Sequence, residues 1–113
     1  MDNAQYSVKF TDYAAGQLSE VVDYISVGRL SPETAIDWTY KIQKKLIALT
    51  YAPERIKLTE EEPWRSREVH QFSVENFYAY FVINEIDREV WVIAFIYAKR
   101  DQKRQLKQMD EQV

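Results

Sequence analysis

The chain has 113 residues, no cysteine, one histidine and a formal net charge of −3. That length is enough for one domain with its own core, and we expect a single domain over residues 1–113. The lack of cysteine excludes disulfides and thiolate metal sites, and the acidic balance argues against a general nucleic-acid-binding domain, which is normally basic.

No apolar run approaches the roughly 20 residues that span a bilayer, and the first residues lack a signal-peptide pattern. We therefore expect a soluble cytoplasmic protein.

The first half of the chain predicts a strand followed by two helices. Residues Tyr6 to Phe10 alternate between apolar and polar, which is typical of a short strand with one buried face. Thr11-Asp12 offers an N-cap to a first helix, and Gly28 suits its end. A second helix begins at Ser31-Pro32-Glu33 and ends at Pro53. Because the linker between them is short, the two helices should form an antiparallel hairpin.

The second half predicts three strands and a tail. A weakly alternating strand is expected around Ser66 to Phe72, after an irregular segment. Two runs rich in β-branched and aromatic residues, Phe77 to Ile83 and Val90 to Tyr97, predict an antiparallel hairpin. A short amphipathic helical tail is expected from about Asp101 to Met109. The expected fold is α+β, with a small antiparallel sheet in β-α-α-β-β-β order, the helical hairpin on one face, and the other face partly open.

Most catalytic signatures are absent from the sequence. It contains no glycine-rich phosphate loop, no nucleophile elbow and no ligand spacing suited to a metal, so we expect no metal and no cofactor. The single histidine, His70, falls in the weak strand. It is either a half-exposed strand residue or an acid/base group.

Three basic groups are candidates for binding a target. They are Arg65 with Arg67, Lys99 with Arg100, and Lys103, Arg104 and Lys107 in the tail. The first pair would share one face of a strand, where it could bind phosphates or carboxylates, or neutralise the neighbouring glutamates. The second pair follows the last strand, beside Tyr97, which could stack on a ligand or close the core. The tail group is most often a solvated face.

The order of elements, the run Phe77-Tyr78-Ala79-Tyr80-Phe81 and the basic exit Ala98-Lys99-Arg100-Asp101 resemble the RelE/ParE family of bacterial toxins. The resemblance covers the chain from Tyr6 to about Met109. It implies the toxin of a type II toxin–antitoxin module, neutralised by a cognate antitoxin that wraps around it. One branch of the family cleaves mRNA in the ribosomal A site, and the other poisons DNA gyrase.

Departures from the family pattern favour the gyrase-directed, ParE-like branch. Arg100 matches the arginine that RNA-cleaving members place after the last strand, but Tyr78 and Leu106 stand where those members carry a strand arginine and a tail tyrosine or histidine. Under the gyrase hypothesis the chain is a binder rather than an enzyme. Its target-contact candidates are Arg65, Arg67, Lys99, Arg100, Lys103 and Arg104.

Two alternatives stay open. One is a ribosome-dependent mRNA endonuclease of the RelE type, with a rearranged site at Arg67, His70, Tyr97 and Arg100. The other is an inactive, toxin-like domain that only binds an antitoxin. In every case Trp38 and Trp64 are candidate anchors for an antitoxin segment, because aromatic side chains often dominate the energy of an interface.

Overall fold

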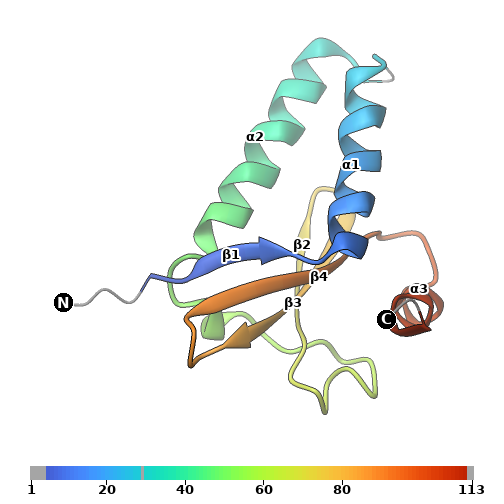
Figure 1. Ribbon diagram of the computed structural model, residues 1–113. Coiled ribbons are helices and arrows are strands. Elements are labelled where there is room, and N and C mark those ends of the chain that lie inside the picture. Colours follow the sequence, from blue (N-terminus) through green and yellow to red (C-terminus); the bar gives the residue numbers. More distant parts are fainter. Residues whose placement is uncertain (1–4, 29, 112–113) are drawn as a thin grey trace.

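The chain folds as a four-stranded mixed sheet with a helical hairpin on one face and a short helix at the end of the sheet (Figure 1). The computed structural model describes residues 5–28 and 30–111, the side chain of Glu111 excepted. Its elements are β1 (Ser7–Phe10), α1 (Asp12–Ser26), α2 (Pro32–Ala48), the 3-10 helix η1 (Pro53–Arg55), β2 (His70–Val74), β3 (Phe77–Asn84), β4 (Glu89–Tyr97) and α3 (Gln102–Glu111). This confirms the expected α+β order.

Both long helices begin where their capping residues predict. The hydroxyl of Thr11 accepts a hydrogen bond from the backbone N–H of Ala14 at 3.2 Å, and the hydroxyl of Ser31 accepts one from Thr34 at 3.2 Å. Each bond satisfies an amide that the first helical turn leaves without a partner. Gly28 follows α1 with φ of 76°, the left-handed conformation that favours glycine.

The second helix ends earlier than expected. It stops at Ala48, and Pro53 begins η1 instead of marking the end of α2. Between them the chain turns through Ala52, whose φ of 43° and ψ of 52° are left-handed and incompatible with a continuing helix.

The sheet has the strand order β1-β4-β3-β2. The expected hairpin is confirmed: β3 and β4 pair antiparallel, with Phe77 opposite Tyr97. The first strand returns past the helical hairpin to pair with β4 in parallel, with Val8 opposite Val90. Thus β4 lies in the interior of the sheet, between a strand from each half of the chain.

The helix-facing side of the sheet holds the larger core. Its fully or nearly buried residues alternate along the strands and include Ala79, Phe81, Val90 and Val92, packed under α1 and α2. The stripes of the helices meet them, as Val21 and Ile42 show. This is the layer arrangement that the periodicity predicted.

The opposite side of the sheet is covered, not partly open as expected. The segment 57–69 and α3 lie against it, and they form a second cluster of buried residues. Its members are Trp64, Val69, Tyr80, Ala94, Ile96 and Leu106. No helix among the described residues is long and apolar enough to cross a membrane.

The strand expected around Ser66 to Phe72 begins only at His70. Residues 62–68 form turns, and Glu68 has φ of 61°, which an extended strand cannot include. The turn conformation brings Trp64 back onto the sheet, where its ring is buried.

Candidate functional site

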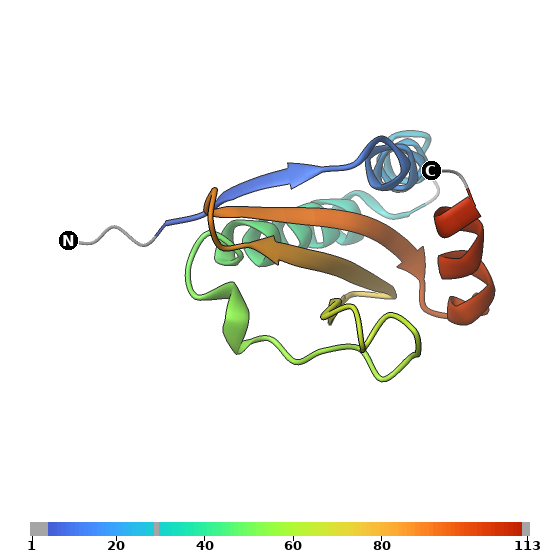
Figure 2. The same ribbon diagram turned by 60° about the horizontal axis from the view of Figure 1, so that its bottom comes forward.

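A groove of about 490 Å³ opens at the carboxyl end of β4. It lies between α1, α2 and α3, and Figure 2 shows α3 standing at this end of the sheet next to α1. Its lining residues come from all the elements that meet there: Gln17, Glu20, Val21, Tyr24, Leu30, Trp38, Asn76, Phe77, Phe95, Ile96, Tyr97, Arg100 and Gln105. The lining is mainly apolar with a few polar groups, which is the usual composition of a binding groove.

Aromatic rings from three elements form the floor of the groove. The ring of Phe77 stacks on Phe95 with centroids 5.0 Å apart, and meets Trp38 edge-on at 5.9 Å. Tyr97 lies tilted against the same ring at 5.6 Å. Because Phe77 contacts all three, its position on β3 sets the floor. Offset and edge-on pairs of this kind are favourable beyond the area that they bury.

The turn that carries Arg100 is held by a partly buried hydrogen-bond network. The side-chain amide N–H groups of Gln102 donate to the carbonyl oxygens of Tyr97 at 2.8 Å and Arg100 at 2.9 Å. The Gln102 amide oxygen accepts from the hydroxyl of Tyr80 at 2.8 Å, and that hydroxyl accepts from Gln71 at 3.1 Å.

Tyr80 has no solvent exposure, and burial raises its pKa to about 12. Its hydroxyl therefore keeps its proton and donates it to Gln102. Sequence reasoning missed Gln102 and Tyr80 as site residues, because neither carries a local signal. Their role depends on a contact between residues 22 positions apart.

The groove carries one acidic and one basic side chain among its lining residues, Glu20 from α1 and Arg100 from the turn after β4. Both act on Tyr13 of α1. Burial chiefly raises the pKa of Tyr13, Glu20 raises it further, and Arg100 opposes them. The positive charge of Arg100 therefore acts on α1 across the end of the sheet.

The structure brings three of the candidate residues together. Trp38, Tyr97 and Arg100 all line the groove. Lys99 is exposed in the same turn, and Lys103 and Arg104 are exposed on the first turn of α3. We call Lys99, Arg100, Lys103 and Arg104 the basic end. The basic end adjoins the groove, so a partner seated in the groove would also meet positive charge.

The arginines at 65 and 67 lie elsewhere, in the turns that cover the second face. They do not sit on a strand, so the expectation of a shared strand face is corrected. Arg65 donates to the carbonyl oxygen of Thr59 at 3.2 Å, and Arg67 pairs with Asp110 of α3 at 3.3 Å. Neither contact is to a neighbouring glutamate. Arg65 thus holds the segment to itself, and Arg67 holds it to α3.

The two candidate antitoxin anchors differ in exposure. Trp64 is only 5% exposed and is buried in the second cluster, with the guanidinium of Arg67 4.9 Å from its ring. Its ring is therefore not available to a partner. Trp38 is half-buried and stands in the wall of the groove, so it keeps the role of candidate anchor.

His70 lies apart from the groove. Its ring stacks on Phe81 at 4.9 Å, and its Nδ1 lies 2.6 Å from the carbonyl oxygen of Ile56, to which it donates. In the sheet His70 lies opposite Phe81, and Phe81 lies opposite Val92 of β4. Val92 is five residues before Tyr97, so His70 and Tyr97 are roughly 16 Å apart along the strand direction.

The four residues of the endonuclease alternative do not meet at one point. His70 is far from Tyr97. Arg67 is bound to Asp110, which lies about 12 Å along α3 from Gln102, the first residue of that helix after the Arg100 turn. In the described part of the chain, no three histidine, aspartate or glutamate side chains are placed to hold a metal ion. The groove itself presents apolar side chains beside the charge of Arg100.

Solved structures with the same fold belong to toxin–antitoxin systems. A chain of the chromosomal ParDE TA system from P. aeruginosa is 21% identical, with a TM-score of 0.62 over 86% of this chain and 100% of that one. A chain of the toxin–antitoxin complex RelBE2 from Mycobacterium tuberculosis is 16% identical, with a TM-score of 0.55 over 82% and 98%.

A mutant of the E. coli toxin RelE in the free state is 14% identical, with a TM-score of 0.51 over 92% of this chain and 97% of that one. No protein-family model matches the sequence, and no curated protein is similar enough to it to indicate a relative. The likeness is thus one of structure, and the chain has the RelE/ParE toxin fold.

Proposed function

We propose that this chain is the toxin of a bacterial type II toxin–antitoxin module, and that a cognate antitoxin protein holds it inactive. The observation that carries the proposal is the fold, which 86% of this chain shares with the whole of a chain from a ParDE system. The groove supports it, because an open, ring-lined groove suits a segment of a partner protein. In this proposal Trp38 is the anchor for the antitoxin.

The proposed target is DNA gyrase in the cytoplasm. The chain would inhibit gyrase by binding to it, without catalysing a reaction. The basic end would contact the target, with Arg100 at its centre. Two observations favour binding over RNA cleavage. The residues of the endonuclease alternative are spread over the molecule, and the net charge of −3 works against attraction to ribosomal RNA.

The test is gyrase-catalysed supercoiling of a relaxed plasmid with the purified chain, scored for inhibition and for trapped cleavage complexes. We expect inhibition by the wild-type chain. Arg100→Glu should need roughly tenfold more protein for the same inhibition, since reversing a contact charge weakens association. Lys57→Glu is the matched control, because it makes the same charge change at an exposed position away from the groove.

A folded chain without effect on gyrase would contradict the proposed target. Ribosome-dependent cleavage of mRNA in a translating extract, abolished by His70→Ala with Arg100→Ala, would then establish the RelE-type alternative. Normal growth when the folded chain accumulates in bacteria without a partner would instead identify an inactive antitoxin-binding domain.

A further inference from the structure

The outer side of α2 carries an apolar stripe that is mostly exposed in the described part of the chain. The stripe consists of Ile36, Tyr40 and Ile47, which are 71%, 61% and 63% exposed. They lie four and seven residues apart, which places them on one side of a helix with 3.6 residues per turn. A surface helix normally presents charged residues on that side.

The stripe is separate from the groove. Trp38 lies two residues after Ile36 and two before Tyr40, about 200° around the helix from each. Its ring packs inward on Phe77, while the stripe points outward. An occupant of the stripe would therefore leave the groove open.

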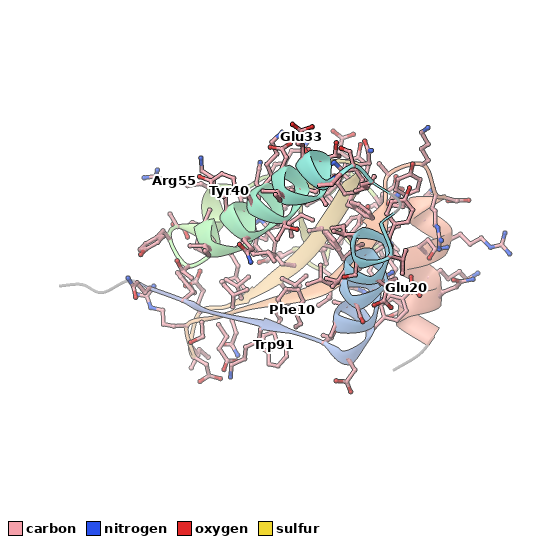
Figure 3. All side chains as sticks on the ribbon, turned by 90° about the horizontal axis from the view of Figure 1, so that it is seen from above. Phe10, Glu20, Glu33, Tyr40, Arg55 and Trp91 are labelled. Carbon is pink, nitrogen blue, oxygen red and sulfur yellow. The ribbon has the colours of Figure 1, made fainter. Side chains whose placement is uncertain are left out.

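Charges flank the stripe in a fixed order. The N-terminal half of α2 carries Glu33 and Asp37, and the C-terminal half carries Lys41 and Lys44. Lys45 is on the inward side, where its amine lies 5.9 Å from the centre of the Phe72 ring. Figure 3 shows Glu33 and Tyr40 following one another along α2. The helix dipole accounts for this order, because it favours carboxylates at the start and amines at the end. It does not account for the exposed isoleucines and tyrosine beside them.

The layout is complementary to itself. In an antiparallel pair of α2 helices related by a twofold axis, the acidic half of each helix faces the basic half of the other. Ile36 then lies opposite Ile47 of a second copy, and the two Tyr40 side chains lie near the axis. A parallel pair would oppose like charges.

We infer that a second copy of this chain docks on the stripe, and that the protein forms a homodimer through antiparallel α2 helices. The inference is independent of the proposed function. Lys41 is already paired with Asp37 of its own helix at 3.0 Å. Lys44, whose amine lies 6.0 Å from the centre of the Tyr40 ring, is the cation that meets Asp37 of the second copy.

Sedimentation equilibrium of the purified chain tests the inference. The variants change the charges beside the stripe and leave its apolar side chains in place. Lys44→Glu places a glutamate opposite Asp37 of the second copy, and Asp37→Lys places a lysine opposite Lys44. Each should weaken self-association about tenfold, because two symmetric contacts change at once. Mixing the two variants should restore a dimer, since an acidic side chain then faces a basic one at both contacts. The controls are Lys57→Glu and Glu54→Lys, which make the same charge changes at exposed positions outside α2.

Ile36→Glu with Ile47→Glu should abolish the dimer while leaving circular dichroism and thermal unfolding unchanged, because both side chains are mostly exposed. A wild-type chain that stays monomeric overturns the inference and leaves the stripe to a different protein. A dimer that ignores these substitutions, or a mixture that fails to associate, overturns it as well.

Discussion

The two faces of the sheet are both covered, but by different means. On one face, α1 and α2 pack their apolar stripes against alternating strand residues such as Phe81 and Val92. On the other, turns around Trp64 and the short helix α3 bury Tyr80 and Leu106. The first cover is periodic and continuous. The second depends on a few large side chains, and it also holds the turn that carries Arg100. The turn that carries Arg100 thus depends on the less redundant of the two layers, whereas the rings at the floor of the groove belong to the first.

The largest expected effect comes from the helix-facing core. Phe81 has no exposure and contacts the rings of His70 and Phe72. Phe81→Ala should lower the free energy of unfolding by about 3–5 kcal/mol, because it removes a buried ring and leaves a cavity between fixed elements. Urea denaturation measures the loss. A loss below about 1 kcal/mol would mean that this face is not the main core.

The second face should respond less to the same kind of change. Leu106→Ala should cost about 2–3 kcal/mol, at the lower end for buried leucines, since α3 is short and can settle into the space. Hydrogen exchange should show faster exchange in α3 than in α1. The exposed neighbour Lys107→Ala is the control, expected to change stability by less than about 0.5 kcal/mol. Equal acceleration in both helices would show that the two faces unfold as one unit.

The network around Tyr80 connects the second face to the groove. Tyr80→Phe should cost about 1–3 kcal/mol, because the amides of Gln71 and Gln102 lose a buried partner. The same variant should also inhibit gyrase less strongly in the supercoiling assay, since the turn that carries Arg100 is less well held. Stability that falls without any change in inhibition would separate the network from the site.

The same tyrosine predicts a dependence on alkaline pH. Its pKa is raised from near 10 to about 12, so the folded state holds the proton more tightly than the unfolded state does. The resulting stability is complete below pH 10 and is lost as pH rises through about 12, by at most about 2 kcal/mol after solvent screening. In Tyr80→Phe this fall should be smaller. Tyr6, Tyr13 and Lys41, whose pKa values are also raised, contribute to the part that remains.

The smallest expected effect lies at a helix cap on the periodic side. Ser31→Ala should cost about 1 kcal/mol, because the amide of Thr34 loses its acceptor. Ser19→Ala, exposed in the middle of α1, should be neutral by comparison. Thermal unfolding measures both, and an equal response would mean that the cap bond adds nothing to the fold.

Sequence patterns predicted the periodic face well. The caps at Thr11 and Ser31, the end of α1 at Gly28 and the pairing of the last two strands follow from local rules, and all are confirmed. Such features depend on residues a few positions apart, so a single sequence reveals them.

The second face and the assembly of the groove could not be predicted in the same way. The pattern around Arg65 and Arg67 indicated a strand, but the left-handed Glu68 and the burial of Trp64 make it a turn. Trp38, Tyr97 and Arg100 were each singled out for separate reasons. Their meeting in one groove depends on how distant elements pack, which no local pattern states.

The parallel pairing of β1 with β4 has a consequence for synthesis. In a chain made from its N-terminus, β1 has no strand to pair with until β4 has been made, about 80 residues later, and closing so long a loop is slow. The groove needs the end of β4 as its floor and α3 as its wall. A growing chain therefore carries its helical hairpin early and completes the groove only after β4 and α3 have been made.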